Sequence, residues 1–248
     1  MSENIEKTTK AFRVDLDSSE NQIMLKPSAR SFSNQAHQVN EAAKKIHKLI
    51  KNAPYSNDNI VLNRNEIKKA FFNPFKPQLE NVQVFLSHSH ADKNKALEAK
   101  NYLENQTKRK VFIDSLFWGY KDDVLNELAE YDDISRIKDA FTLILRESLQ
   151  DMIEKCPYFV FLQSKNSVSL NQGLLHHQDL LKITYSAWIY EELKIANTFI
   201  ADTALQELHI KAMRVSYDVT NLLRRFKPIS LDSLCKKIAF NLITKDTK

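Results

Sequence analysis

The chain has 248 residues, a length that allows one large domain or two small ones. It contains only two glycines, where an average content of about 7% would give about 17. The Walker-type phosphate loop and the dinucleotide fingerprint G-x-G-x-x-G both need several glycines close together, so both are excluded. Hydrophobic residues make up 43% and charged residues 27%, and no apolar run approaches the length of a membrane span.

The net charge of +5 is spread unevenly, because residues 1–80 carry 13 basic and 9 acidic side chains. An excess of this size is typical of a solvated surface, so neither a nucleic acid nor a membrane is predicted as a partner. The first ten residues contain no apolar signal core, and the two cysteines, Cys156 and Cys235, form no C-x-x-C pair. These features predict a cytoplasmic protein with free thiols.

The first third of the chain predicts a mostly helical extension that precedes the main domain. Residues 1–35 are polar and are expected to be loosely structured. Apolar residues recur at helical spacing across residues 36–50, which predicts an amphipathic helix, and a short helix is expected around residues 65–72. We therefore predict a partly disordered extension at residues 1–80 and the main domain at residues 81–248.

From residue 81 onwards the chain alternates between strands and helices. The predicted strands are 82–87, 110–114, 158–162 and a weak one at 213–217, and the predicted helices are 92–106, one from Asp122 onwards, 134–155, 187–200 and 231–244. Residues 165–184 fit neither pattern. The alternation predicts an α/β fold, a doubly wound flavodoxin-like parallel sheet with helices on both faces. Ligands bind beyond the carboxyl ends of the strands in such sheets, so the loops after Leu86, Ile113 and Leu162 are the candidate ligand sites.

Glu192 interrupts the apolar face of the helix expected at residues 187–200. At about 100° per residue, one continuous face is formed by Trp188, Ile189, Leu193, Ile195, Ala196, Phe199 and Ile200. Glu192 projects into the middle of this face, one turn after Trp188. Burying a carboxylate without a partner is expensive, so Glu192 either pairs with a core cation or opens into a cleft as a catalytic group. The helical spacing alone leaves both interpretations open.

Four segments of the chain carry a resemblance to a known family. They are Val84-Phe-Leu-Ser-His-Ser-His-Ala-Asp92, Val111-Phe-Ile-Asp114, Phe159-Val-Phe-Leu-Gln-Ser164 and Ser186-Ala-Trp-Ile-Tyr-Glu-Glu-Leu193. In this order they resemble the first, second and fourth strands and the S-x-W-x-x-x-E-L motif of Toll/interleukin receptor (TIR) domains. The family's catalytic glutamate lies four residues after the tryptophan of that motif, which is Glu192 here. The long segments 132–157 and 164–186 look like those of bacterial TIR-like proteins of anti-phage defence.

The resemblance implies cleavage of NAD at the nicotinamide–ribose bond, with NAD as the substrate and with no cofactor or metal. Glu192 would be the catalytic residue, because a carboxylate near the ribose stabilises the sugar cation that forms as the bond breaks. The substrate would be bound by Ser87, His88, Ser89 and Asp92 of the first loop, by Phe117 and Trp118 of a loop after the second strand, and by Trp188. Gly119 in that second loop suggests a backbone bend. The product would be ADP-ribose or a cyclic isomer.

Two other functions stay open at this stage. Many TIR domains assemble with copies of themselves without catalysing a reaction, and Glu192 would then have a structural role. Self-association is expected in either case, and residues 1–80 are a candidate segment for binding an effector or regulator protein. His88-Ser-His-Ala-Asp92 also half-matches the H-x-H-x-D-H zinc motif of metallo-β-lactamase-type hydrolases, although Lys93 stands in place of the final histidine.

Overall fold

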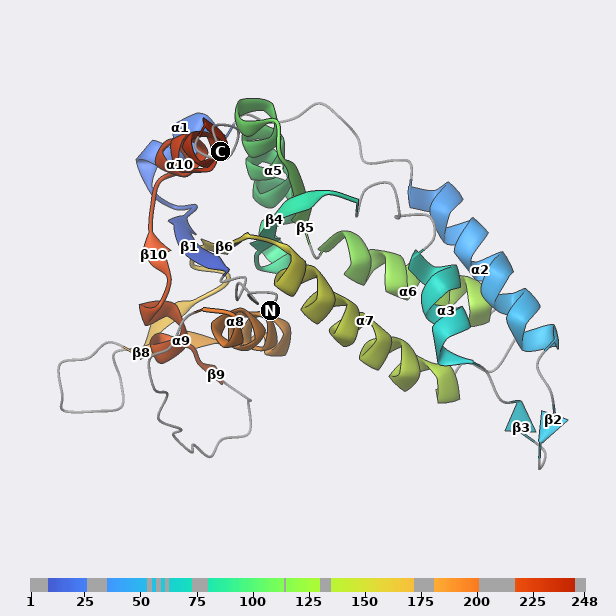
Figure 1. Cartoon of the computed structure of the whole chain (residues 1–248). Coiled ribbons are helices and arrows are strands. Elements are labelled where there is room, and N and C mark those ends of the chain that lie inside the picture. The colour runs from blue at the N-terminus through green and yellow to red at the C-terminus, as the bar shows by residue number, and fades with distance from the viewer. Residues whose placement is uncertain are drawn as a thin grey trace, which may run out of the picture. The chain divides into compact units, whose positions relative to one another are not determined.

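The computed structural model describes residues 9–25, 35–52, 55–56, 59–60, 63–72, 80–113, 115–129, 135–171, 181–200 and 217–243 (Figure 1). The chain divides into two compact units. The sheet unit comprises Met1–Pro27, Val82–Asp114 and Gln150–Lys248, and the helical unit comprises Ser28–Asn81 and Ser115–Leu149. The chain therefore passes from one unit to the other four times, and the predicted boundary near residue 80 matches one of these four points.

A parallel sheet forms the centre of the sheet unit. Among the described residues it has five strands, in the order β10 (Lys227–Pro228), β1 (Lys10–Asp15), β6 (Tyr158–Gln163), β4 (Val82–Ser87) and β5 (Lys110–Ile113). All neighbouring strands in it run parallel. The apolar strand sequences explain the core, in which Phe85 of β4 stacks on Phe159 of β6 with ring centroids 5.3 Å apart.

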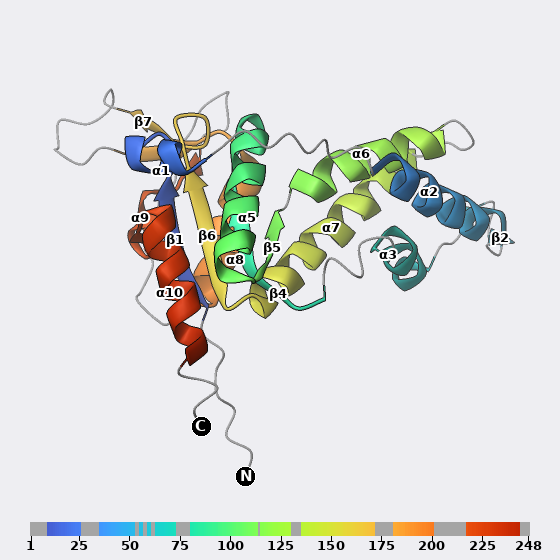
Figure 2. The ribbon, with the colours of Figure 1, turned by 90° about the horizontal axis from the view of Figure 1, so that it is seen from above.

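Helices cover both faces of this sheet (Figures 1 and 2). One face carries α5 (Lys93–Thr107), α10 (Leu231–Ile243) and the short α1 (Ser19–Met24), and the other carries α8 (Ala187–Thr198). The helix α9 (Thr220–Arg224) packs against α8. The predicted α/β class with a parallel central sheet flanked by helices is confirmed, and the arrangement is compatible with a flavodoxin-like fold.

The strand β1 corrects the expectation for the N-terminal residues. Residues 10–24 are not loosely structured, because β1 pairs with β6 along its whole length and α1 follows it. Phe12, Val14 and Leu16 alternate along the chain and are buried on one face of the sheet. β1 thus lies inside the sheet, and this part of the predicted extension belongs to the sheet unit.

The helical unit contains α2 (Gln35–Asn52), α3 (Arg64–Phe72), α6 (Ser115–Ala129) and the first part of α7 (Ser135–Lys155), with a short hairpin of β2 (Tyr55–Ser56) and β3 (Asn59–Ile60). The helices predicted at 36–50 and 65–72 are confirmed. The α2 residues Ala42, Ala43, Ile46 and Ile50 are buried, as their helical spacing predicts, and α2 packs against α3 and α6.

The loop predicted around residues 117–120 is wrong. The helix α6 begins at Ser115, seven residues before the predicted start, so the backbone at Phe117 and Trp118 is helical. Gly119 lies inside this helix and marks no bend there. The described residues with positive φ are instead Asn81 and Lys108, so this glycine-poor chain makes its left-handed turns with other residue types.

A second sheet accounts for part of the segment that fits no sequence pattern. Within the described residues it consists of β7 (Ser169–Asn171), β8 (Leu181–Thr184) and β9 (Tyr217–Asp218), all antiparallel. Most of the weak strand predicted at 213–217 lies outside the described residues.

Both cysteines are buried free thiols, as predicted. No helix among the described residues combines the length and apolar character needed to cross a bilayer.

Candidate functional site at the carboxyl end of the sheet

The strands β4 and β6 lie side by side, and the chain leaves their carboxyl ends in opposite directions. From β4 the chain passes through α5 to β5 at the sheet edge, and it then returns across β4 to form β6. The order of strands reverses at this point, and the crevice outside such a reversal is where open α/β sheets bind ligands. The predicted loop that follows Leu86 begins here, with Ser87 as the last residue of β4.

Glu192 meets Ser87 at this end of the sheet. Ser186 caps α8 by accepting a hydrogen bond from the backbone N–H of Ile189, which sets the direction of the helix. Glu192 then falls on the buried face of α8, as its helical spacing predicts, and is only 1% exposed. Its Oε2 accepts a hydrogen bond of 2.6 Å from Ser87 Oγ, which is fully buried.

This hydrogen bond gives the Glu192 carboxylate a fixed position. A buried carboxylate needs hydrogen-bond donors, and the Ser87 hydroxyl supplies one. Trp188 lies one turn earlier on α8 and is half-buried, so the predicted tryptophan belongs to the same region of the helix. The carboxylate is closed to solvent in this structure. A substrate can therefore reach it only after local movement of the residues that cover it.

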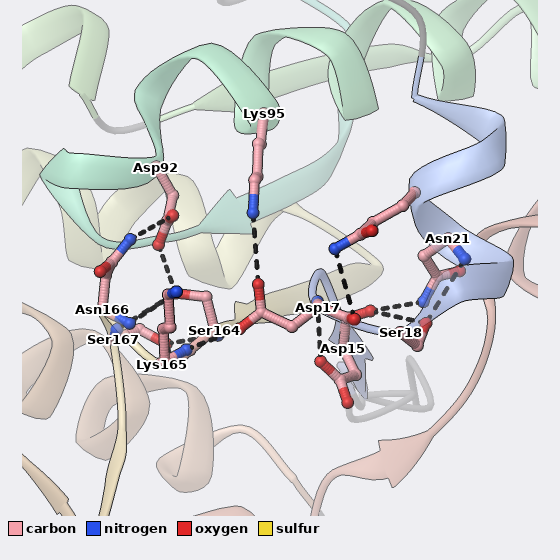
Figure 3. A network of polar contacts seen from close by, with 11 residues as sticks. Asp15, Asp17, Ser18, Asn21, Asp92, Lys95, Ser164, Lys165, Asn166 and Ser167 are labelled. Carbon is pink, nitrogen blue, oxygen red and sulfur yellow. Dashed lines mark hydrogen bonds and ion pairs between the residues drawn. The ribbon is translucent and has the colours of Figure 1, made fainter.

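Asp92 has a structural role that the sequence does not predict (Figure 3). It occupies the N-cap position of α5 but makes no capping hydrogen bond through its side chain. Its Oδ2 accepts a hydrogen bond from Ser164 Oγ, and its Oδ1 accepts one of 2.8 Å from Asn166 Nδ2. Asp92 is only 3% exposed, so it joins the loop after β4 to the loop after β6 rather than facing open space.

Asp17 extends this network to the turn after β1 (Figure 3). Its carboxylate accepts a 2.9 Å hydrogen bond from the backbone N–H of Lys165 and pairs with Lys95 of α5 at 3.2 Å. The Lys165 N–H, followed by the Lys95 ammonium, holds the pKa of Asp17 below its ordinary value. Three loops at the carboxyl end of the sheet are therefore tied together by two aspartates.

The other predicted substrate-binding residues lie in different surroundings. His88 is buried at the start of the loop, and Ser89 is half-buried and precedes the short helix η2 (His90–Asp92). Phe117 and Trp118 belong to α6 of the helical unit, and their side chains lie outside the described residues. The structure thus brings Ser87 and Glu192 together, while a ligand contact by Phe117 or Trp118 stays a prediction.

A cavity of about 460 Å³ opens beside the ends of β1, β6 and β10, and sequence reasoning missed it. Its lining includes Arg13 of β1, Gln163 of β6 and Lys182 of β8. Arg13 alternates with the buried Phe12 and Val14, so strand alternation would have placed it on the opposite face from them once β1 was recognised. Lys182 lies in the segment 165–184, which offers no pattern.

Burial, and then the neighbouring charge of Arg13, lowers the pKa of Lys182. Both cations line this cavity, and the charge of each disfavours the charge of the other. Within the described residues, no group of three or more His, Cys, Asp or Glu side chains has the arrangement to hold a metal ion.

Comparisons with known protein families, curated proteins and solved structures found no match to the chain.

Proposed function

We propose that this chain is a TIR-like enzyme that cleaves NAD at the nicotinamide–ribose bond, with Glu192 as its catalytic carboxylate. The observation that carries the proposal is the position of Glu192. It is buried on α8, held by Ser87 at the carboxyl end of β4, where the strand order reverses. The motif resemblance that singles out Glu192 and the helical spacing that singles it out are independent reasons for choosing this residue.

The chemistry needs a fixed negative charge. When the bond between nicotinamide and C1′ of the ribose breaks, its electron pair leaves with neutral nicotinamide and the ribose becomes a cation. The Glu192 carboxylate stabilises that cation by electrostatics and can hold the ribose hydroxyls. Water then adds to C1′ and loses a proton, which gives ADP-ribose, or a nucleophile within the same molecule adds and gives a cyclic product. Ser87 acts as a positioning residue through its hydrogen bond to Oε2.

The burial of Glu192 adds a requirement to the proposal. Because the side chain is 1% exposed, the enzyme must open locally before NAD can contact the carboxylate. Self-association, which the resemblance also implies, is a natural trigger for such an opening. Activity is then expected to rise more steeply than the protein concentration. Anti-phage defence is the biological setting that the resemblance implies.

Nicotinamide release from NAD tests the proposal. The purified chain is incubated with NAD over a wide range of protein concentrations, and the products are separated by chromatography. Glu192→Gln keeps the size of the side chain and removes the charge, so release is expected to fall at least about a hundredfold. Glu191→Gln is the matched control, the same change one residue earlier on α8, where the side chain is half-buried. Equal release by wild type and Glu192→Gln, or none by either, would overturn the proposal.

The same burial favours a second candidate, a module that assembles with copies of itself and catalyses no reaction. In that case the Ser87–Glu192 hydrogen bond serves only to join α8 to β4. Light scattering and sedimentation then show assembly in both wild type and Glu192→Gln, while NAD stays intact at every protein concentration. Assembly accompanied by nicotinamide release excludes this candidate.

A further inference from the structure

The cavity beside β1 has the size of a small-molecule site. Its volume of about 460 Å³ lies within the range of about 300–1,000 Å³ that is usual for such sites. Its lining comes from the turn after β1, the carboxyl end of β6, the strand β8 and the residues that follow β10. It therefore lies at the carboxyl edge of the parallel sheet, the edge at which α/β proteins bind ligands.

Two cations on the cavity wall lack a counterion among the described residues. Arg13 and Lys182 are both half-buried, and neither side chain makes a hydrogen bond or an ion pair with another described residue. Burial is the first cause of the lowered pKa of Lys182, and the unfavourable charge of Arg13 is the second. An anion bound between them would offset the repulsion and supply charge-assisted hydrogen bonds, for which a phosphate group is well suited.

A third wall residue needs a hydrogen-bond donor. Gln163 lies on the same face of the sheet as Arg13, because Arg13 pairs with Phe161 in the register of β1 and β6 and side chains two residues apart share a face. The Gln163 side-chain oxygen Oε1 is buried and accepts no hydrogen bond from any described residue. A buried acceptor of this kind is costly unless a ligand or water donates to it, and a sugar hydroxyl is such a donor.

The lining also holds two carboxylates, Asp15 and Glu20, and neither forms an ion pair with Arg13 or Lys182. Asp15 and Glu20 are both exposed, in contrast to the half-buried cations. One oxygen of Asp15 already accepts a 2.9 Å hydrogen bond from the backbone N–H of Asp17. The turn that carries them is held by Asn21, whose Nδ2 donates to the Asp15 carbonyl and whose Oδ1 accepts from the Leu231 N–H of α10 (Figure 3 shows the first of these bonds). The wall is thus built in advance of any ligand.

We propose that this cavity binds a phosphorylated ribose, with Arg13 and Lys182 on the phosphate and Gln163 accepting a hydrogen bond from a ribose hydroxyl. This site is separate from the Ser87–Glu192 pair, and the proposal stands whether or not the chain cleaves NAD. Three observations agree on it: the cavity volume, the two cations without a described counterion, and the buried oxygen without a described donor.

Isothermal titration calorimetry with ribose 5-phosphate, ADP-ribose and inorganic phosphate tests the proposal on the full chain. Ribose 5-phosphate and ADP-ribose are expected to bind. Arg13→Met and Lys182→Met keep the apolar stem of each side chain, and each should weaken binding about tenfold or more. Lys194→Met is the matched control, because it makes the same change at an exposed position of α8. Thermal melting of every variant checks that it is folded.

Gln163→Met separates the sugar from the phosphate. It should weaken the binding of ribose 5-phosphate and leave that of inorganic phosphate unchanged. Failure of both sugar phosphates to bind the wild type at millimolar concentration would overturn the proposal. So would equal weakening by Lys194→Met and Lys182→Met, or inorganic phosphate binding as tightly as ribose 5-phosphate. Because these measurements use no NAD cleavage, their outcome is independent of the catalytic proposal.

Discussion

The Ser87 hydroxyl and the Glu192 carboxylate form a buried hydrogen bond of 2.6 Å between residues that are 105 positions apart in the chain. Removing the Ser87 hydroxyl takes this hydrogen bond from a carboxylate that stays buried. We expect Ser87→Ala to lower the free energy of unfolding by about 1–3 kcal/mol. Urea denaturation measures this change. Ser89→Ala, at the half-buried serine two residues further on, should change it by no more than about 0.5 kcal/mol.

A positioning role for Ser87 has a kinetic signature that a purely structural role lacks. If the hydroxyl orients the carboxylate toward the ribose, Ser87→Ala should lower kcat for nicotinamide release about ten- to a hundredfold with little change in KM. Ser87→Thr keeps the hydroxyl and should recover much of the rate. A loss of activity that simply follows the fraction of unfolded protein, with no recovery in the threonine variant, would leave Ser87 with a structural role alone.

Asp17 makes the stability of the sheet unit depend on acid pH. The pKa of Asp17 is lower in the folded chain than its ordinary value of 3.8, first because the Lys165 N–H donates to the carboxylate and then because Lys95 lies beside it. The stabilisation is complete above the unfolded pKa, and it is lost as the pH falls through the folded pKa. Asp17→Asn should therefore lose less stability than wild type between about pH 6 and pH 3. Urea midpoints across this range provide the measurement, and parallel curves would contradict it.

Local periodicity accounts for what the sequence predicts correctly. Helical spacing places Glu192 on the buried face of α8, and the apolar run of β4 identifies the strand that ends at Ser87. The burial of one polar residue of α8 is an exception. Asn197 is buried there because its Nδ2 donates to the carbonyls of Leu193 and Leu222, and no spacing rule includes such a partner on another helix.

Features that depend on distant partners are the ones the sequence does not predict. The alternation of Phe12, Val14 and Leu16 is a short signal within a polar segment, and β1 owes its place to its pairing with β6, almost 150 residues away. The loop expected at Phe117 and Trp118 came from the family resemblance rather than from the residues themselves, which are helical in the structure. The wall of the cavity depends on Lys182 of β8, in a segment without a pattern.

Lys108 tests whether the use of another residue where glycine is favoured lowers the stability of this chain. It ends α5 in the left-handed conformation, with φ of 54°, and its backbone N–H donates to the Glu104 carbonyl. A Cβ is unfavourable there and glycine has none, so Lys108→Gly should raise the free energy of unfolding by about 0.5–1 kcal/mol. The Lys108 side chain is exposed, so little packing is lost. The matched control is Lys110→Gly, at the exposed first residue of β5, which should destabilise the chain.

We expect the charged Lys182 side chain to destabilise the folded chain while it provides a positive charge for the ligand. Burial and the charge of Arg13 lower its pKa in the folded chain below the ordinary 10.5. For a base with a lowered pKa, the destabilisation is fully present below the folded pKa and disappears as the pH rises to the unfolded value. Lys182→Met should therefore melt at a higher temperature than wild type at neutral pH, and this difference should shrink at alkaline pH. Lys194→Met should show neither effect.

The same variant links stability to binding. A saturating phosphorylated ribose should raise the melting temperature of wild type, because a ligand that binds only the folded chain stabilises it. The same ligand should raise the melting temperature of Lys182→Met much less. The difference between the two melting temperatures should therefore shrink or change sign when the ligand is present. Differential scanning calorimetry with and without ribose 5-phosphate measures both effects. A variant that is more stable than wild type yet binds less is the pattern expected of a binding residue held in an unfavourable position. A lower melting temperature for Lys182→Met at neutral pH would show instead that the Lys182 ammonium is already paired in the folded chain.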